Sequence, residues 1–326
     1  MRASGWASAT EMGLASAGDA IAAVGLRKRF GGVTAVDGLE LVVRAGEVFG
    51  LVGPDGAGKT TTMRILCGAL AADEGTAKVA GFEVGSHPEE VKRRIGYLPQ
   101  RLALYSDLTV DENILFQARI QGVREPELSA RRERLLSFTR LGRFRGRQVQ
   151  ALSGGMRQKL GLACALIHEP TVLLLDEPTT GVDPVSRGEF WELVLGLVAR
   201  GITVLVTTPY MDEAERCARV GLMYEGKLLA IGRPDEIKRQ AALSLLQVSC
   251  DPLREGREVA RRVPGVRWVE IFGDRLHVAV LSAEVAGALS EGFARGGVQV
   301  AGVTPVEPGL EDAFFELVSR GREAEA

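Results

Sequence analysis

The chain has 326 residues, of which 46% are hydrophobic and 25% charged, a balance that excludes a disordered polypeptide and allows more than one packed core. Its formal net charge of −2 gives no electrostatic reason to expect nucleic acid as a partner. No apolar run approaches the ~18–20 residues that a membrane-spanning helix needs. Any role at a membrane is therefore expected from the cytoplasmic side, as a peripheral subunit held by a partner.

Arginines and cysteines give no sign of a separate site. The arginines gather in residues 131–134 and 143–147, which we interpret as a solvated helix face and a loop. The four cysteines lie far apart, in apolar or helical stretches without the spacing of a metal site. This is typical of reduced core thiols in a cytosolic protein. They are Cys67, Cys164, Cys217 and Cys250.

The first elements lead into a glycine-rich loop. Residues 1–22 are rich in alanine, serine and glycine and are predicted to be a flexible tail. Apolar and polar residues alternate over residues 39–43, as in a half-buried strand. Residues 47–52 predict a buried strand, and a helix is expected over residues 59–70 after the loop.

The loop between this strand and helix has the pattern of a phosphate-binding loop. Its glycines let successive backbone N–H groups point inward at the positive end of a helix, where they meet a polyphosphate. Lys59 is expected to hold the β- and γ-phosphates, and the Thr60 hydroxyl to ligate Mg²⁺. The predicted nucleotide contacts here are Gly53, Pro54, Asp55, Gly56, Ala57, Gly58, Lys59, Thr60 and Thr61.

The middle of the chain, over residues 110–147, is predicted to be mostly helical and charged. Two stretches have the spacing of a capping box, in which a Ser or Thr caps a helix and a Glu three residues later reaches back to the cap N–H. One pairs Ser86 with Glu89, and the other pairs Thr109 with Glu112.

A short apolar strand predicted over residues 171–175 ends in two carboxylates. Asp176 is placed to hold Mg²⁺ through its water shell, which leaves Glu177 free to orient and deprotonate an attacking water. An acidic turn after a strand is common by chance, so the pair gains its weight from the phosphate loop with Lys59.

Helix and strand continue to alternate after these carboxylates. Asp183 and Pro184 suit a helix cap and the first helical position, and apolar residues follow at helical spacing through residues 190–197. Residues 202–206 predict another buried strand. Such alternation indicates an α/β fold with a mainly parallel sheet and helices on its faces.

The composition changes near residues 232–234, and residues 244–326 are predicted to form a small accessory α+β domain. Its pattern is strand, helix, strand, strand, helix, strand, with a hairpin turn at Gly273 and Asp274 between the middle strands. The six predicted ranges are residues 246–250, 254–263, 266–272, 276–280, 283–295 and 298–303.

Residues 152–158, with the sequence LSGGMRQ, can form a second phosphate-binding helix start, since Ser153 can cap the helix and the glycines expose N–H groups. The stretch resembles the signature motif of ABC ATPases. The resemblance implies a P-loop cassette over residues 23–240, with a helical subdomain at about residues 100–160. In that family two cassettes face each other, so each ATP lies between one phosphate loop and the other signature. The residues expected to contact the partner's ATP are Ser153, Gly154, Gly155 and Gln158.

Further positions match the same family. Phe30 lies where an aromatic ring stacks on adenine, although a plain core role suits it nearly as well. Gln100 resembles the Q-loop glutamine, which senses Mg²⁺ and meets the membrane subunit. Asp183 belongs to a stretch similar to the D-loop, with Val182 in place of the usual leucine. The implied cofactors are ATP and Mg²⁺, with Mg²⁺ held by Thr60, Gln100 and Asp176.

Two positions depart from the family pattern. Pro209 stands where a switch histidine normally follows two threonines, and proline has neither a ring nitrogen nor a backbone N–H to reach a γ-phosphate. Asp55 stands for the usual asparagine and adds negative charge near the triphosphate. We expect a site that binds ATP and hydrolyses it poorly, paired with a competent second cassette in a heterodimer or a fused chain. The alternative is that Pro209 is tolerated.

Other stretches are similar to ATPases of the bacterial drug-resistance exporters, namely residues 96–100, 104–110 and 308–315. The resemblance implies an ATP-binding subunit that serves a separate integral-membrane permease. Leu310 and Phe314, in the last stretch, equally suit an amphipathic helix on the accessory domain. A non-transport ABC ATPase remains the alternative, as does a regulatory subunit without its own turnover, with which Pro209 is consistent.

Overall fold

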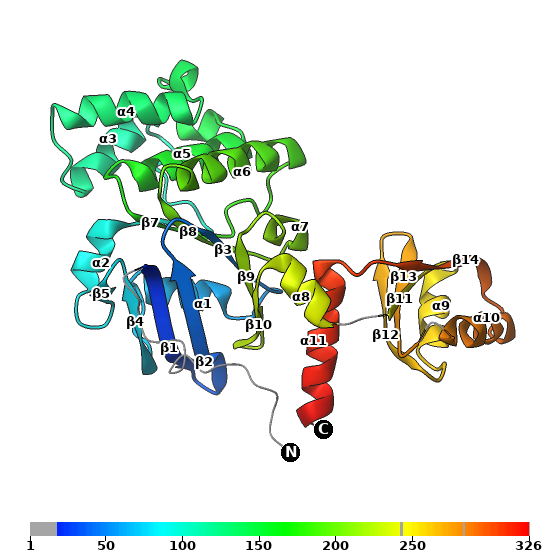
Figure 1. Cartoon of the computed structure of the whole chain (residues 1–326). Helices are drawn as coiled ribbons and strands as arrows, with labels where there is room; N and C mark the ends of the chain where they lie inside the picture. The colour runs from blue at the N-terminus through cyan, green and yellow to red at the C-terminus, as the bar shows by residue number, and fades with distance from the viewer. Residues whose placement is uncertain (1–17, 242–243, 283, 326) are drawn as a thin grey trace. The chain divides into compact units, whose positions relative to one another are not determined.

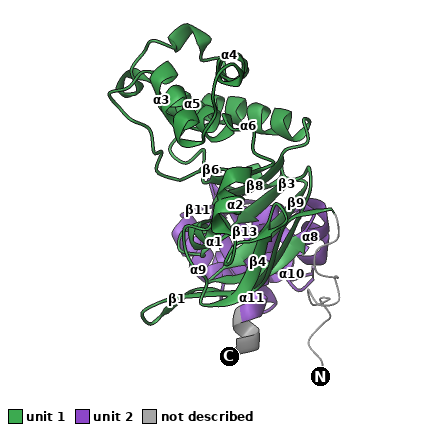
Figure 2. Cartoon of the chain, turned by 90° about the vertical axis from the view of Figure 1, so that its left-hand side faces the viewer, with its two compact units in different colours: residues 1–231 green, residues 232–326 purple. Residues whose placement is uncertain are grey.

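The computed structural model describes residues 18–241, 244–282 and 284–325, and contacts divide the chain into two compact units, residues 1–231 and 232–326 (Figures 1 and 2). The second unit begins before the predicted end of the cassette at residue 240, because helix α8 (Pro234–Ala241) packs on the last helix of the chain. Strand β1 (Asp19–Phe30) begins inside the segment predicted to be a tail, and residues 1–17 of that prediction lie outside the described residues.

A six-stranded sheet with the order β10-β9-β3-β8-β7-β6 forms the centre of the first unit. Strands β6, β7, β8, β3 and β9 pair in parallel, which confirms the predicted mainly parallel sheet. The middle strands β3, β7 and β8 are buried throughout, as their apolar runs predicted. The strands span Val48–Val52 (β3), Ile95–Leu98 (β6), Val172–Asp176 (β7), Thr203–Thr208 (β8), Arg219–Tyr224 (β9) and Lys227–Gly232 (β10).

An antiparallel sheet with the order β2-β1-β4-β5 lies beside helix α1 (Lys59–Leu66). Its alternating residues Leu39, Leu41 and Val43 are buried, and they join Phe49 of β3 in one hydrophobic cluster. The other strands are β2 (Val33–Arg44), β4 (Glu74–Val79) and β5 (Phe82–Glu83), and α2 (Pro88–Arg94) follows.

Helix α1 ends at Leu66, short of the predicted residue 70. The chain turns away because Gly68 adopts a φ of +71°, the left-handed conformation that commonly stops a helix.

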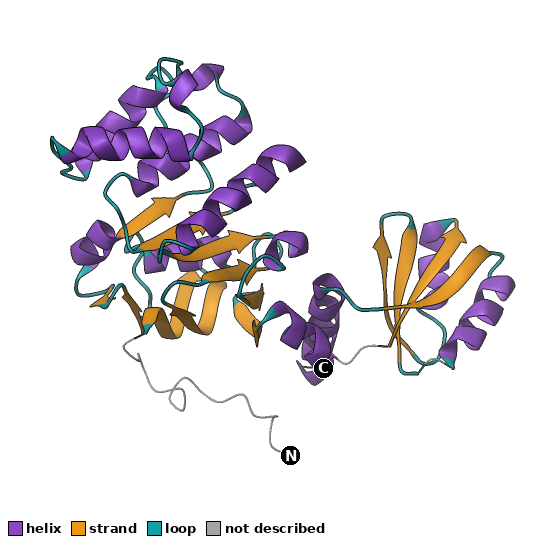
Figure 3. Cartoon of the chain, turned by 45° about the horizontal axis from the view of Figure 1, so that its top comes forward, coloured by secondary structure: helices purple, strands orange, loops and turns teal. Residues whose placement is uncertain are grey.

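Three helices form a separate layer with its own hydrophobic cluster, while α6 runs beside α5 (Figures 1 and 3). They are α3 (Val110–Ile120), α4 (Glu127–Phe138) and α5 (Gly154–Leu166); α6 spans Pro184–Val198 and α7 Met211–Ala214. The Thr109 capping box is confirmed at α3. The Ser86 box is wrong, because α2 begins with Pro88 at its first position and His87 as its cap, so the Ser86 hydroxyl bonds Glu83 instead.

The second unit has the order β-α-β-β-α-β in an antiparallel sheet β12-β13-β11-β14, a ferredoxin-like arrangement. Every predicted element of this domain is present, with ends shifted by a few residues. They are β11 (Ser244–Asp251), α9 (Leu253–Ala260), β12 (Val266–Phe272), β13 (Arg275–Val280), α10 (Val285–Arg295) and β14 (Gln299–Val306).

The last helix, α11 (Leu310–Glu325), packs on the accessory sheet with its apolar residues Leu310 and Phe314 buried. Asp312 accepts a hydrogen bond from His277 of β13, and Glu316 accepts one from the Trp268 indole of β12. The amphipathic-helix interpretation of this stretch is therefore confirmed. Among the described residues, no helix is both long enough and apolar enough to cross a membrane.

Candidate functional site

The glycine-rich loop leaves strand β3 at its carboxyl end and enters helix α1 at Lys59. A Cβ at Gly53 would lie 2.0 Å from the Met223 carbonyl oxygen, and one at Gly58 would lie 2.2 Å from the Ala35 carbonyl oxygen. Gly58 also has a φ of +104°, which side chains rarely permit. The two glycines therefore let the loop lie tightly against its neighbours as it leads into α1.

Lys59 is only 3% exposed, and its ammonium group is fully engaged. Its Nζ donates to the carbonyl oxygens of Gly53 and Pro54 at 2.7 and 2.9 Å. It also lies 3.1 Å from the Glu177 Oε1. The lysine therefore links the phosphate loop to the end of β7, the two segments that the sequence predicted to act together.

Asp176 lies in the same cluster of oxygen atoms as Thr60. Its Oδ1 accepts hydrogen bonds from the Thr60 hydroxyl at 3.0 Å and from the Thr207 hydroxyl at 2.8 Å. Burial raises the pKa of the Asp176 carboxyl, and the two hydroxyl bonds oppose that shift. A hydroxyl and a carboxylate at a helix start form the sparse oxygen ligand set that Mg²⁺ uses beside phosphates and water, so Thr60 and Asp176 fit that ion.

Glu177 combines burial, charge and backbone strain. It is a non-glycine residue with a φ of +47°, held there because its N–H donates to the Thr207 Oγ1 at 2.9 Å. Its Oε2 accepts from the Gln100 Nε2 at 2.9 Å, while its Oε1 lies near Lys59. The predicted Q-loop residue thus contacts the predicted catalytic carboxylate directly.

The segment after β8 is held by a buried carboxylate that sequence reasoning missed, Glu213. This residue is 1% exposed and accepts hydrogen bonds from the hydroxyls of Thr179 at 2.6 Å and Thr208 at 2.7 Å. The Arg187 Nε donates to the same carboxylate at 3.1 Å. Glu213 therefore fixes Thr208, the residue before Pro209, to the stretch that leads into the D-loop. In the sequence, Glu213 is only an acidic residue near the start of a helix, and no motif marks it as buried.

Pro209 lies at the turn after β8, with its neighbours bonded around it. The Tyr210 N–H donates to the Thr208 Oγ1 at 3.1 Å, and the Gly53 N–H donates to the Thr208 carbonyl at 3.3 Å. His87 and His168 are engaged elsewhere, with Ser86 and with the Ile95 carbonyl. His277 belongs to the second unit. Neither histidine of the first unit takes the predicted switch position.

The signature stretch starts helix α5. Ser153 caps this helix by accepting from the Met156 N–H at 3.3 Å. A Cβ at Gly155 would lie 2.5 Å from the Ser186 Cβ, so glycine lets α5 approach the start of α6. Asp183 caps α6 by accepting from the Ser186 N–H at 3.0 Å, and this bond lowers the pKa of its carboxyl.

A pocket of about 470 Å³ brings three of the predicted segments together. It is lined by Gln100, by Gly154 and Gln158 of α5, and by Thr180 and Gly181 ahead of Asp183. The predicted Q-loop, signature and D-loop segments therefore border one pocket.

Phe30 lies at the end of β1 in the hairpin with β2, and 51% of it is exposed. The Ala35 carbonyl of β2 touches the position of Gly58, so this hairpin lies beside the phosphate loop. Exposure favours a stacking surface over the core role that suited Phe30 in the sequence. Asp55 is likewise exposed, within the loop itself.

Comparison with known proteins finds that residues 36–180 match the ABC transporter family. The chain is 42% identical over 300 residues to the probable multidrug ABC transporter ATP-binding protein YbhF of Escherichia coli, covering 90% of this chain and 51% of YbhF, or about half of that relative's length. It is 40% identical over 256 residues to the daunorubicin/doxorubicin resistance ATP-binding protein DrrA of Streptomyces peucetius, covering 78% of each chain.

Among solved structures, an ATP-binding subunit of an ABC transporter superposes with a TM-score of 0.62 at 30% identity, covering 68% of this chain and 93% of that one. Its fold and the matching sequences agree with the loop, carboxylates and capped glycine turn described above. The chain belongs to the family of ABC transporter ATP-binding proteins.

Proposed function

We propose that this chain is the ATP-binding subunit of an ABC exporter, which couples ATP binding and hydrolysis to transport by a separate integral-membrane permease. The observation that carries the proposal is the contact of Lys59 with Glu177 at the mouth of the phosphate loop. The names of YbhF and DrrA, which refer to multidrug transport and drug resistance, support export. The subunit acts at the cytoplasmic face of the membrane.

Each predicted site residue of this chain has a separate role in binding or hydrolysing ATP. The backbone N–H groups at the end of the loop and in the first turn of α1 bind the triphosphate, and Lys59 exchanges its carbonyl and carboxylate partners for phosphate oxygens. Thr60, Asp176 and Gln100 would hold Mg²⁺, which would neutralise phosphate charge when bound. Glu177, released from Lys59, orients a water and accepts its proton, while Gln100 fixes the free carboxylate oxygen. Phe30 stacks on adenine.

A second cassette completes each ATP site. Ser153, Gly154, Gly155 and Gln158 contact the triphosphate held by the partner, and Asp183 lies in the loop between the two sites. Ser153 is exposed at the start of α5, where backbone N–H groups and the helix dipole favour an anion.

Pro209 makes the two sites of such a pair unequal. A switch histidine stabilises charge on the transferred phosphoryl group, and proline has no donor for it. Asp55 adds charge of the same sign as the phosphates. The site of this chain therefore binds ATP and hydrolyses it slowly, while its intact signature completes a competent site on a different cassette, as a heterodimer or a fused chain.

Steady-state ATP turnover by the purified chain tests this asymmetry. The chain alone is expected to bind ATP with little turnover, Lys59→Ala is expected to abolish binding, and Pro209→His is expected to raise turnover in the assembled pair. Unchanged affinity in Lys59→Ala would contradict nucleotide binding at this loop. A rate typical of transporter ATPases for the unmodified chain alone would contradict the asymmetry.

The absent switch histidine also favours a second candidate, a regulatory ABC subunit without its own turnover. Pull-down from detergent-solubilised membranes separates the two functions. Recovery of an integral-membrane protein together with a second cassette supports the exporter, whereas recovery of soluble proteins alone supports the regulatory subunit.

A further inference from the structure

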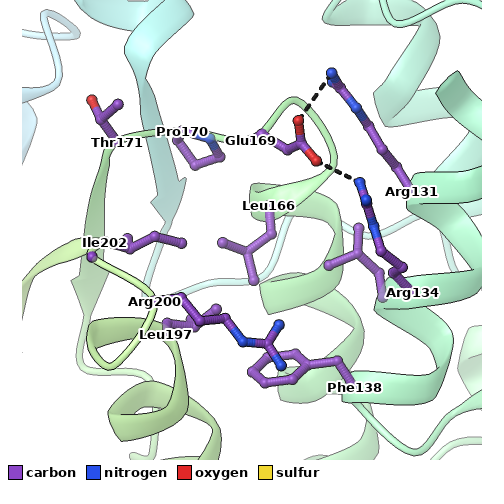
Figure 4. Close-up of a pocket in the computed structure, with 12 residues that line it drawn as sticks. Arg131, Arg134, Phe138, Leu166, Glu169, Pro170, Thr171, Leu197, Arg200 and Ile202 are labelled. Carbon is purple, nitrogen blue, oxygen red and sulfur yellow. Dashed lines mark hydrogen bonds and ion pairs between the residues drawn. The ribbon is translucent and has the colours of Figure 1, made fainter.

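The first unit has a second pocket, of about 460 Å³, at the edge of the central sheet (Figure 4). It lies where the chain enters β7 and β8, whose far ends carry Asp176 and Thr208. Helix α4 forms the other wall. The volume is within the range of small-molecule pockets. None of the predicted nucleotide-binding residues lines it.

The inner wall of this pocket is apolar. Leu166 and Leu197 are almost fully buried, and the Phe138 ring and the Ile202 side chain line the pocket with them (Figure 4). Such a wall suits a flat or branched hydrocarbon body, because burying apolar surface is favourable and aromatic rings stack with their planes offset.

Three arginines and a single carboxylate border the pocket. Glu169 bridges two of them, with its Oε2 3.0 Å from the Arg131 Nη2 and its Oε1 2.6 Å from the Arg134 Nη2. The third, Arg200, holds its guanidinium carbon 4.9 Å from the centre of the Phe138 ring. The lining therefore has an excess of positive charge directly beside an apolar wall. The interpretation of residues 131–134 as a plain solvated face is incomplete here.

We propose that this pocket binds a small amphiphilic anion, with an aromatic or branched hydrocarbon body and a carboxylate, sulfonate or phosphate head. The body lies against Phe138, Leu166 and Leu197. The head accepts hydrogen bonds from Arg200 and from the outward N–H groups of Arg134, since a guanidinium presents five donors in a planar fork. This site does not rest on the proposed function, because nucleotide binding uses other residues.

Fluorescence titration of the full-length chain with anilinonaphthalene sulfonate tests the proposal, with the uncharged parent anilinonaphthalene as the matched probe. Saturating Mg²⁺ and ATP are present throughout, so that the nucleotide site is filled and cannot supply the signal. The sulfonate is expected to bind about tenfold more tightly than its parent, the ratio for one charge-assisted contact.

Arg200→Leu is expected to weaken sulfonate binding about tenfold while changing the parent less than about twofold. Arg143→Leu is the matched control, since the Arg143 guanidinium lies 4.7 Å from the Phe144 ring outside the pocket, and it leaves both affinities unchanged. Thr171→Trp, which fills the pocket from an exposed lining residue, weakens both probes. Equal affinity for the two probes, or equal effects of the Arg200 and Arg143 substitutions, would overturn the assignment.

Discussion

The buried charges of the nucleotide site are held for function at a cost in stability. Asp176 is almost fully buried, and its raised pKa means that the folded chain binds the proton more tightly than the unfolded chain does. Its contribution to stability is therefore complete below the ordinary pKa of Asp, about 3.9, and is lost as the pH rises through the raised pKa. Once it is ionised, the buried carboxylate costs stability, and a cation bound beside it would offset that cost.

Asp176→Asn is therefore expected to become more stable relative to the unmodified chain as the pH rises from about 4 to neutrality. The amide oxygen can still accept from Thr60 and Thr207, so the comparison isolates the charge. Denaturant unfolding without nucleotide, repeated across this pH range, measures the difference. A gap that does not change with pH would show that the Asp176 charge has no part in it.

The contribution of Glu213 to stability can be tested by comparison with Asp212, its neighbour in the sequence. Glu213→Gln leaves the partly buried Arg187 without its buried counter-charge, and breaking such a pair is expected to lower the unfolding free energy by about 3 kcal/mol. Asp212→Asn removes the exposed partner of the same arginine, for which about 0.5 kcal/mol is expected. Urea unfolding of both variants gives the comparison, and similar losses would refute the role of Glu213 as the buried anchor.

The two capping-box sequences of this chain differ in the structure, because only one of them caps its helix. In the structure the Thr109 hydroxyl accepts from the Glu112 N–H at 3.2 Å, and the Glu112 carboxylate accepts from the Thr109 N–H at 2.8 Å. Ser86 makes no such bond to α2. Thr109→Ala is expected to cost about 1 kcal/mol of unfolding free energy and Ser86→Ala close to zero. Thermal unfolding of the two variants measures this, and an equal cost would contradict the assigned caps.

Sequence patterns formed by residues close together in the chain predicted several strands and helices correctly. The buried strands β3, β7 and β8 followed from apolar runs, and all six elements of the accessory domain followed from alternation and turn signals. Strand β1 was missed, because the alanine-rich start of the strand resembles a tail until β2 and β4 pair with it. Its burial comes from distant partners that local composition cannot reveal.

The candidate site likewise contains residues that short motifs predict and residues that only the fold brings together. The phosphate loop, Asp176, Glu177 and Ser153 lie in short motifs, and their places were predictable. Glu213 and the arginine pocket depend on residues far apart in the chain, so no spacing within one segment pointed to them. The proposed effect of Pro209 rests on the hydrogen-bond donors that proline lacks, which is a property of the residue alone.

At the level of the whole chain, the two units have separate hydrophobic clusters, so a ligand of one is expected to stabilise that unit alone. Trp191 of α6 and Trp268 of β12 report on the two units separately. In single-tryptophan variants that also carry Trp6→Phe, Mg²⁺ and ATP at one hundred times the dissociation constant are expected to add about 2.7 kcal/mol to the transition reported by Trp191.

The transition reported by Trp268 is expected to stay unchanged, as followed by fluorescence during thermal unfolding. A matched shift in both signals would show that the chain unfolds as one cooperative body. Lys59→Ala is the control, since it removes the ligand effect without touching either tryptophan.

The ion pair between Lys59 and Glu177 couples two events, triphosphate binding and release of the Glu177 carboxylate. On the proposed role of Glu177 as the base, the Lys59 ammonium group masks that base in the absence of nucleotide, and a competing phosphate oxygen draws the lysine away. Arrival of the triphosphate and unmasking of the base are thus one step. Without nucleotide, the Glu177 carboxylate stays paired with Lys59, the residue proposed to bind the phosphates. On this mechanism it can activate water only when ATP is bound.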